Sequence, residues 1–298
     1  MNSKTYAYLW FKSRGASQDE IIRETGITPQ EYEELERAQA QTLEQIKRDQ
    51  HRSETIGPDF VRLTRYIYGG ASAQMQGKPC PPVINPPSGE LIPLPKVDEL
   101  SEPTLSLKQA ILQRRSLREY SAKPFTLQEL SFMLWASCQV NELRQGKNIE
   151  ITRRQVPSAG SRHPFECHLL INRVEGIPTG LYYYHPIQHG LILRESGPDI
   201  AAHVLEACRD QEMVVRSAFT LILSARPYRT AWRYQQRSYR YLYVDAGHVG
   251  QNVHLAAEAL NAGSCMVGAF TDELLDACLG LDGIEEFAIY VMPVGKKP

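Results

Sequence analysis

The stretch RRSLREYSAKPF, residues 114–125, concentrates positive charge in a 298-residue chain whose formal net charge is only −1. Ser106 and Thr126 each begin an S/T-x-x-E/Q capping box, which predicts one helix running to about residue 113 and another opening at residue 127. The charged stretch is therefore expected to be the loop between two helices, and binding residues concentrate on loops. Three arginines lie within five residues of this loop: Arg114, Arg115 and Arg118.

These arginines, together with the hydroxyl of Ser116, predict a site for a phosphate monoester. Guanidinium groups match phosphate oxygens bidentately and keep their charge when partly buried. The sequence contains no G-x-G-x-x-G, no G-x-x-x-x-G-K-[ST], no H-E-x-x-H and no G-x-S-x-G, so side chains rather than a glycine-rich loop would hold the phosphate. The alternative is a solvated basic loop with surface ion pairs, for which Glu119 lies close by.

Composition and charge exclude several classes of protein. A hydrophobic content of 42% and a charged content of 22% are ordinary for a globular chain. The near-zero net charge gives no sign of a nucleic-acid or anionic-membrane partner, and no apolar run approaches the roughly 18 residues of a membrane span. The N-terminus lacks the apolar core and cleavage site of a signal peptide. The six cysteines show no metal-ligand spacing, so a cytoplasmic protein without a metal site is expected.

The sequence divides into a helical N-terminal arm (1–56), a proline-rich extended segment (57–103) and a catalytic domain (104–298). In the arm, Ser17 and Gly26 mark the ends of one helix and Pro29 the start of the next. This helix-turn-helix pattern suggests DNA binding as one alternative. Four glutamates on the second helix argue against it, because they would repel DNA phosphates, so a packing or dimerisation arm is favoured. Eight of the chain's 19 prolines lie between residues 79 and 103, which predicts an extended segment wrapping the surface.

Within the catalytic domain, strands alternate irregularly with helices, which predicts an α+β fold rather than a doubly wound one. The runs ECHLLINRV, TGLYYYHP, GLILRES, AFTLILSAR and EFAIYVMPVG read as strands. Residues 241–262 read as a long helix, on which Asp245, His248 and Asn252 form a polar stripe. This stripe is either a face of the active site or a buried hydrogen-bonded cluster that stabilises a dimer interface.

Four segments taken together resemble the nitroreductase-like FMN enzymes, and in particular their SagB-type dehydrogenase branch. RRSLREYSAKPFTLQEL resembles R-R-S-x-R-x-[FY] followed by a helix beginning [TS]-x-x-[ED]-L, and the PSAG of RRQVPSAGSRHPFECHLLI resembles P-S-[AS]-G. TGLYYYHPIQHGLIL resembles the G-L-Y-x-Y…H-x-L hairpin of that branch, and DAGHVGQN its D-A-G-H-x-x-Q-N helix. The similarity covers about residues 100–298, and the motifs occur in the family's order.

The resemblance implies a nitroreductase-like fold, with a mostly antiparallel sheet flanked by helices, in a homodimer that binds FMN at its interface. The FMN phosphate and ribityl chain would be bound by Arg114, Arg115, Ser116 and Arg118. Pro157, Ser158, Ala159 and Gly160 would approach the flavin from the partner subunit, and Val267, Gly268 and Ala269 would lie near its N5 edge. Lys296 and Lys297 would supply further phosphate counter-charges.

The SagB-type branch includes azoline dehydrogenases, which place a Lys-Tyr pair before an R-G-Y-R-Y segment. The matching stretch here is WRYQQRSYRY, so the catalytic pair would be Arg233 and Tyr234, with Ser238 in place of the glycine. Arginine cannot act as a base, but Tyr234 could shuttle a proton if the neighbouring charge favoured its phenolate. The implied activity is hydride transfer through flavin N5, on a peptide-derived azoline or a similar ring. The alternatives are an NAD(P)H-dependent nitroreductase or quinone reductase, and a non-catalytic flavin-binding dimer.

Overall fold

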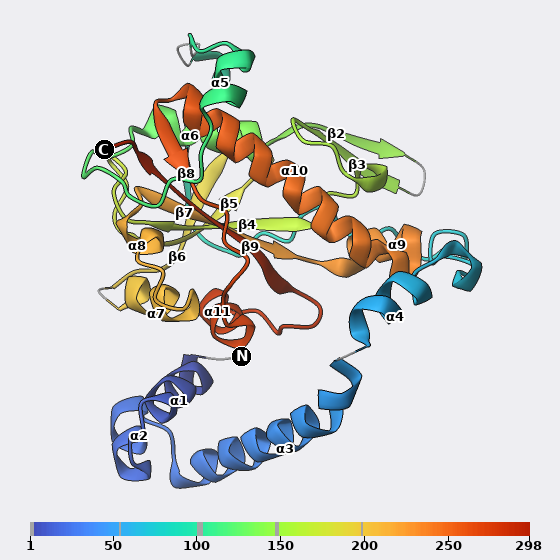
Figure 1. Cartoon of the computed structure of the whole chain (residues 1–298), viewed down its shortest axis with the longest axis vertical. Helices are drawn as coiled ribbons and strands as arrows, with labels where there is room; N and C mark the ends of the chain where they lie inside the picture. The colour runs from blue at the N-terminus through green and yellow to red at the C-terminus, as the bar shows by residue number, and fades with distance from the viewer. Residues whose placement is uncertain (1–2, 54, 100–103, 147–148, 198) are drawn as a thin grey trace.

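A seven-stranded sheet lies at the centre of the computed structural model, which describes residues 3–53, 55–99, 104–146, 149–197 and 199–298 (Figure 1). All paired strands run antiparallel, in the order β1-β6-β5-β4-β7-β9-β8. The α+β prediction and the five predicted strands are confirmed. The bounds are β1 Leu91–Pro93, β4 Phe165–Ile171, β5 Gly180–His185, β6 Gly190–Glu195, β7 Phe219–Ala225, β8 Ala262–Ser264 and β9 Phe287–Lys296.

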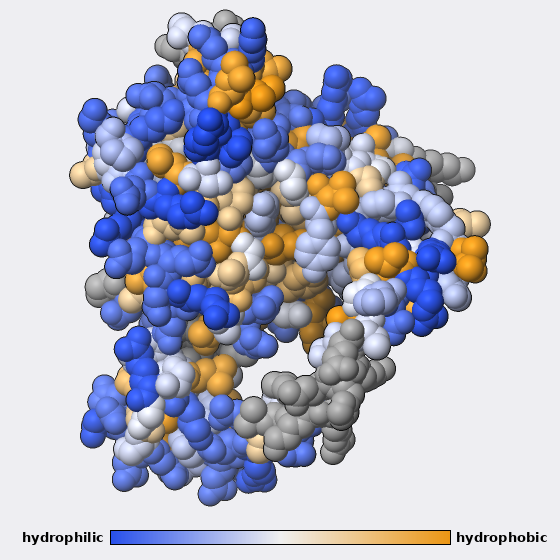
Figure 2. Space-filling view, viewed as in Figure 1, coloured by the Kyte–Doolittle hydropathy of each residue, from blue (hydrophilic) through white to orange (hydrophobic). Residues whose placement is uncertain are grey.

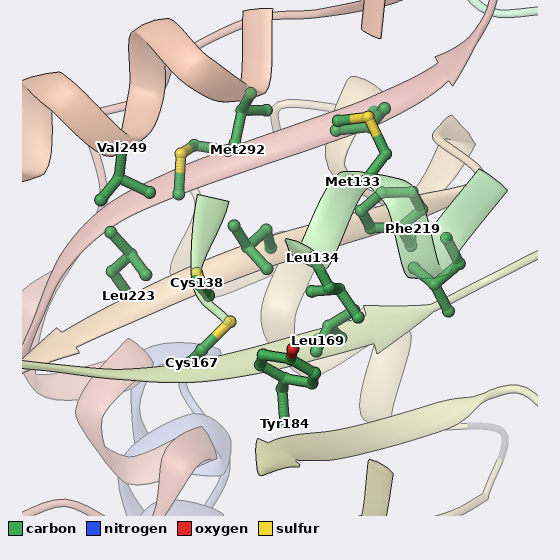
Figure 3. Packing of buried hydrophobic residues seen from close by; sticks show 14 of the residues in the cluster. Met133, Leu134, Cys138, Cys167, Leu169, Tyr184, Phe219, Leu223, Val249 and Met292 are labelled. Carbon is green, nitrogen blue, oxygen red and sulfur yellow. The ribbon is translucent and has the colours of Figure 1, made fainter. Parts of the chain in front are cut away.

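Helices cover both faces of the sheet, and side chains of the central strand β4 pack into the hydrophobic cores on both faces. Leu169 joins the core beneath α6 and α10, whereas its neighbour Leu170 joins the core beneath α7 and α11. Successive side chains of a strand point to opposite faces, so a strand that is buried on both sides is apolar throughout. Figure 3 shows the first of these cores from close by. The helices are α6 Leu127–Ser137 and α10 Ser238–Ala259 on one face, and α7 Ile200–Ala207, α8 Met213–Arg216 and α11 Asp272–Leu279 on the other.

Helix α10 connects the two regions that carry the predicted site residues. It begins at Ser238, three residues before the predicted start, and its 22 residues span about 33 Å at 1.5 Å per residue. One end follows α9 (Pro227–Tyr234) and the 3-10 turn η4 (Gln235–Arg237), and the other end leads into β8. Figure 1 shows α10 crossing the sheet face between them.

A separate hairpin of β2 (Val140–Gly146) and β3 (Ile149–Arg154) was not predicted from the sequence. Every residue of β2 after Val140 is exposed, so the strand lacks the apolar alternation on which strand prediction depends. The short helices α7, α8, α9 and α11 were not predicted either.

The N-terminal residues form α1 (Ser3–Ser13), α2 (Gln18–Thr25) and α3 (Pro29–Ser53). As predicted, Ser17 accepts a hydrogen bond from the Glu20 amide, and Gly26 ends α2 in the left-handed conformation. Four side chains from these helices and their connection form a small core of their own: Tyr8, Ile21, Ile27 and Tyr32. Helix α1 packs against α11, and its Trp10 ring lies 6.2 Å from that of His203 on the neighbouring helix α7.

Residues 57–68 differ from the prediction, because they are mostly helical rather than extended. Helix α4 (Ile56–Leu63) crosses the expected boundary, and the 3-10 turn η1 (Tyr66–Tyr68) follows it. Pro58 is tolerated because it lies in the first turn of α4, where its missing N–H has no intrahelical acceptor. After Tyr68 the described part of the segment has no further α-helix: it turns at residues 73–77, includes the strand β1 and ends in the 3-10 turn η2 (Val97–Glu99). The last predicted residues of the segment, 100–103, lie outside the described residues.

Two further observations apply to the described ranges alone. No helix in them is both long enough and apolar enough to cross a membrane. No group of three or more histidine, cysteine, aspartate or glutamate side chains in them could hold a metal ion.

Candidate active site

The arginine loop lies against β8, at the C-terminal end of α10. Ser116 pairs with Ser264 in a parallel bridge, and the Leu117 amide donates to the Ser264 carbonyl at 2.9 Å. Gly263 permits this approach, because a Cβ there would lie 2.6 Å from the Leu117 side chain. The backbone therefore holds the loop in place, which leaves the arginine side chains available for other partners.

The three arginines have different surroundings. Arg115 turns back on helix α5 (Leu107–Gln113), where its Nη1 donates to the carbonyls of Leu112 at 3.0 Å and Arg114 at 2.8 Å. Such a contact satisfies carbonyls that the end of a helix leaves without partners. Within the described residues, neither Arg114 nor Arg118 has a hydrogen-bond or ion-pair partner for its guanidinium. These two guanidiniums therefore remain available to a ligand.

A buried histidine lies beside this charge. His254 Nδ1 is 2.9 Å from Ser264 Oγ. Burial, reinforced by the positive charge of Arg114, lowers the pKa of His254 to about 4. The imidazole is therefore neutral at pH 7 and adds hydrogen-bonding capacity rather than charge to this end of the site.

The two C-terminal lysines already have carboxylate partners. Lys297 forms an ion pair with the buried Glu258. Lys296 forms one with Glu129, and its ammonium group also donates to the Leu260 carbonyl at 3.1 Å. Their predicted role as phosphate counter-charges would require these pairs to rearrange, so Arg114 and Arg118 are the better candidates.

The segment after β8 offers two backbone amides rather than three. Val267 exchanges both backbone hydrogen bonds with Val291 of β9, at 2.8 and 3.1 Å. Gly268 and Ala269 are exposed, and in the described part of the chain no hydrogen bond uses either amide. Of the three predicted residues, Gly268 and Ala269 can therefore donate to a ligand, whereas the Val267 amide is committed to the sheet.

Asp245 of α10 holds the segment Pro157–Gly160 near the other end of the helix. Ser158 Oγ donates to Asp245 Oδ2 at 2.6 Å, and the Ala159 amide donates to the same oxygen at 3.1 Å. Burial raises the pKa of Asp245, and these two hydrogen bonds oppose that shift. The polar stripe on α10 thus includes a positioning residue, while Asn252 donates to the Ala136 carbonyl at 2.7 Å and ties α10 to α6.

Gly160 brings this segment into contact with Arg233 and Tyr234. It adopts a φ of 60°, and a Cβ there would lie 2.6 Å from Tyr234 Oη and 3.3 Å from Arg233 Cδ. The Arg233 guanidinium carbon lies 5.5 Å from the centre of the Tyr234 ring. Two motifs that are more than 70 positions apart in the sequence therefore meet at one place.

The turn after Tyr234 contains a strained residue that the sequence did not reveal. Gln235 adopts φ 53° and ψ −141°, a conformation that is costly for a residue with a Cβ and that tends to occur at functional sites. Its side-chain amide bonds both backbone groups of Gly70: Oε1 accepts from the Gly70 amide at 3.0 Å, and Nε2 donates to the Gly70 carbonyl. No motif or periodicity in the sequence signals this pairing.

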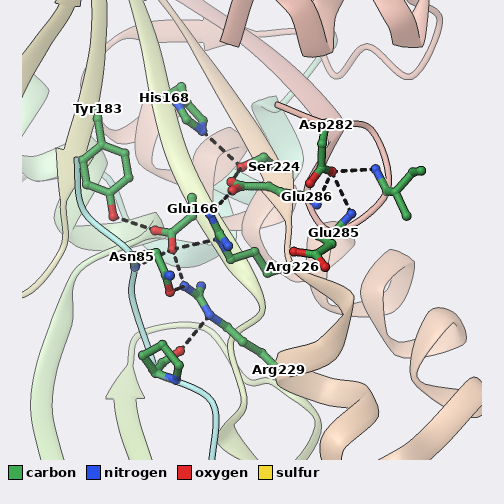
Figure 4. Close-up of polar contacts among 12 residues, drawn as sticks. Asn85, Glu166, His168, Tyr183, Ser224, Arg226, Arg229, Asp282, Glu285 and Glu286 are labelled. Carbon is green, nitrogen blue, oxygen red and sulfur yellow. Dashed lines mark hydrogen bonds and ion pairs between the residues drawn. The ribbon is translucent and has the colours of Figure 1, made fainter. Parts of the chain in front are cut away.

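A buried ionic cluster anchors α9, the helix that ends at Tyr234 (Figure 4). Glu166 of β4 accepts from Arg229, from Tyr183 Oη at 2.6 Å and from the Asn85 amide at 2.8 Å. Burial alone would raise the pKa of Glu166, but the Arg229 charge and these hydrogen bonds outweigh it and hold the pKa below its ordinary value. Arg229 also donates to the Pro82 carbonyl at 2.9 Å, so the cluster ties α9 to the sheet and to the proline-rich segment.

Within one chain, the two groups of candidate residues lie far apart. Asp245 contacts Ser158 and Glu258 contacts Lys297, and the two acids are 13 positions apart on α10 (258 − 245), or about 20 Å at 1.5 Å per residue. The structure brings Gly160, Arg233 and Tyr234 together, and it brings the arginine loop to β8. It does not bring these two groups to each other.

Comparison with known proteins agrees with this arrangement. Residues 111–296 match the family model described as "Nitroreductase family". The chain is 34% identical over 206 residues to MJ1384 of Methanocaldococcus jannaschii, described as a nitroreductase, and the match covers 69% of this chain and 96% of that one. It is 28% identical over 163 residues to the trifolitoxin-processing protein TfxB of Rhizobium leguminosarum bv. trifolii, covering 52% of this chain and 43% of that one.

Among solved structures, one described as a nitroreductase of Anabaena variabilis ATCC 29413 aligns with a TM-score of 0.53 at 26% identity, covering 63% of this chain and 37% of that one. The antiparallel sheet and the helix layers on both of its faces define an α+β fold. The chain belongs to the nitroreductase family, whose members are generally flavin-dependent oxidoreductases.

Proposed function

We propose that this protein is an FMN-dependent oxidoreductase of the SagB-type dehydrogenase class, acting on a peptide-derived azoline or a similar ring. The observation that carries the proposal is the pair of unpartnered guanidiniums, Arg114 and Arg118, on a loop that the backbone holds against β8. These groups would bind the terminal phosphate together with the Ser116 hydroxyl, because forked guanidinium donors match phosphate oxygens. The neutral His254 behind the loop avoids further repulsion among the cations.

The remaining residues also suit a flavin. When bound, FMN supplies an N5 position that accepts or donates a hydride. The free amides of Gly268 and Ala269 would donate to the flavin edge. The segment Pro157–Gly160, which Asp245 positions, would approach the flavin from a second subunit.

Homodimerisation is part of the proposal because one chain separates the two groups of residues by about 20 Å along α10. Apolar side chains on α5 and α10 are exposed, and they are of the kind that an interface covers. Figure 2 shows apolar surface at the top of the molecule, over α5. The exposed side chains are Leu107, Ile111 and Leu112 on α5, with Tyr243 and Val244 on α10.

Tyr234 would handle the proton in ring oxidation. Converting an azoline to an azole removes two hydrogens, one as a hydride and one as a proton from Cα. An arginine cannot accept that proton, so the hydroxyl of Tyr234, whose ring lies 5.5 Å from the Arg233 guanidinium carbon, is the candidate proton acceptor. Similarity to TfxB, whose name describes the processing of trifolitoxin, supports a peptide-derived substrate.

A second candidate is an NAD(P)H-dependent nitroreductase or quinone reductase, which the 34% identity to MJ1384 over 96% of its length favours. This reaction needs no proton abstraction from a ring carbon, so Tyr234 would be dispensable for it. The two candidates share the cofactor and differ in the role of this residue.

The variant Tyr234→Phe separates the two candidates. We expect it to abolish oxidation of an azoline-containing peptide and to leave NAD(P)H-driven nitroarene reduction within about twofold of wild type, because only the first reaction uses the hydroxyl. Tyr228→Phe, an exposed tyrosine of the same helix, is the matched control. Equal loss of both activities in Tyr234→Phe would contradict the assigned role. A bound flavin reduced by neither substrate would favour a non-catalytic flavin-binding dimer.

A further inference from the structure

A cavity of about 290 Å³ lies beside Tyr234 and opens to solvent. One wall is residues 233–237, the end of α9 and the turn η4. The other is formed by residues between 63 and 75, which belong to a segment that we call the strap (residues 63–78). The strap lies N-terminal to the part of the chain that matches the family model, residues 111–296. This wall is therefore a feature of this chain rather than of the family core.

The strap is fixed to α9 and to the turn η4 at several points. The Gln74 amide donates to the Trp232 carbonyl at 2.9 Å, and Trp232 Nε1 donates to the Lys78 carbonyl at 3.0 Å. Arg237 Nη1 donates to the Thr64 carbonyl at 3.1 Å. Because both ends of the strap are held, the cavity is preformed, and a ligand would bind without the cost of ordering a loop.

The charged side chains that line the cavity are all positive. Arg65, Arg233 and Arg237 line it, and no aspartate or glutamate does. Among the described residues, no carboxylate forms an ion pair with any of the three. The nearby Arg62, by contrast, is paired with Asp59 at 2.7 Å.

One tyrosine next to the cavity, Tyr241, responds to this charge, and two others offer flat apolar surface. The Arg237 guanidinium carbon lies 4.3 Å from the centre of the Tyr66 ring, and Arg237 Nε donates to Tyr241 Oη at 2.9 Å. Burial alone would raise the pKa of Tyr241, but its hydrogen bonds to Tyr66 and Arg237 and the nearby arginine charges outweigh that effect and lower it. Tyr66 and Tyr68 are exposed at the cavity, where their rings could pack against the body of a ligand.

We propose that this cavity is a subsite for an anionic group, a carboxylate or a phosphate, carried by the molecule that reacts beside Tyr234. The identity of the reacting centre rests on the proposed function, whereas the anion preference rests on Arg65, Arg233 and Arg237 alone. Two sources fit this chemistry: an acidic residue near the reacting ring of a peptide, or the phosphates of a nicotinamide dinucleotide. Guanidinium groups bind both kinds of oxygen anion.

Calorimetric titration of the purified full-length protein, in low-salt buffer without phosphate, tests the subsite. The probes are an acetylated, amidated tetraglutamate, the matching tetraglutamine, and NADP⁺, which does not reduce the flavin. The double variant Arg65→Gln/Arg233→Gln removes the two guanidiniums for which no hydrogen bond is described. The control is Arg194→Gln, which removes an exposed charge from β6.

We expect tetraglutamate or NADP⁺ to bind more tightly than tetraglutamine, with affinity about tenfold weaker in the double variant and unchanged in Arg194→Gln. Whichever anion binds identifies the source. The subsite is overturned if neither anion binds better than tetraglutamine, or if the double variant binds as tightly as wild type. Flavin content measured on the same samples separates the two claims: anion binding without flavin leaves the subsite standing and contradicts the proposed function.

Discussion

Arg114 and Arg115 are adjacent in the sequence but differ in what their side chains contact. Arg115 donates to two carbonyls at the end of α5, whereas the guanidinium of Arg114 has no described hydrogen-bond partner. We expect Arg114→Gln to weaken FMN binding about 10- to 100-fold, since a hydrogen bond to a charged group contributes about 1.5–3 kcal/mol. Arg115→Gln should change the affinity less than about threefold. Fluorescence titration of flavin-free protein with FMN measures both constants.

This pair of variants serves as its own matched control, because each removes one guanidinium from the same loop. Equal losses in the two variants would mean that Arg115 leaves the helix end to bind the phosphate. No loss in Arg114→Gln would mean that the unpartnered guanidinium faces only solvent, which is the alternative that the sequence left open.

At the residue scale, the sequence identified candidate residues better than it identified their surroundings. The spacing along α10 singled out Asp245, and its hydrogen bonds to Ser158 and Ala159 give that residue a positioning role. The sequence could not show that Lys296 and Lys297 pair with Glu129 and Glu258, because these partners are 167 and 39 positions away. Such pairings depend on tertiary contacts that no local pattern encodes.

At the scale of elements, α9 depends on the ion pair between Glu166 and Arg229, both of which are 2% exposed. Glu166→Gln should lower the free energy of unfolding by about 3–5 kcal/mol, because removing one partner leaves a buried, uncompensated charge. Urea denaturation measures this change. The control is Glu142→Gln, which breaks an exposed pair with Arg144 and should leave the free energy of unfolding unchanged within error, because solvent screens such pairs. A loss below about 1 kcal/mol in Glu166→Gln would contradict the anchoring role.

Elements with strong local signals were predictable, and those that depend on distant contacts were not. The capping boxes at Ser106 and Thr126 are both formed, and the apolar runs form strands. Helix α9 was not predicted, although Pro227 stands at its first position, where a proline favours the start of a helix. The predicted extended segment began too early, because residues 56–63 form a helix whose apolar side chains are largely exposed.

At the scale of the whole molecule, the proposal requires two copies of the chain for each flavin site. One subunit would supply Arg114 and Arg118, and the other would supply Tyr234. Mixing the inactive variants Arg114→Gln/Arg118→Gln and Tyr234→Phe, with subunit exchange, should restore azoline oxidation to about one quarter of wild type. Half of the dimers would then be mixed, and one of the two sites in each mixed dimer would be intact.

Each variant exchanged with itself is the control, and it should remain inactive. No recovery in the mixture, with exchange verified by mass spectrometry, would mean that both groups of residues serve a site within one chain. We expect recovery instead, because Asp245 and Glu258, which contact the two groups of residues, lie about 20 Å apart along α10.

The measurement that tests the central claim most directly is the absorption spectrum of the purified protein, with the released chromophore identified by chromatography after denaturation. The account predicts two flavin bands, in the near-ultraviolet and the blue, and FMN as the chromophore. A colourless protein that takes up no added FMN would contradict it, and Arg114 and Arg118 would then face water rather than a phosphate.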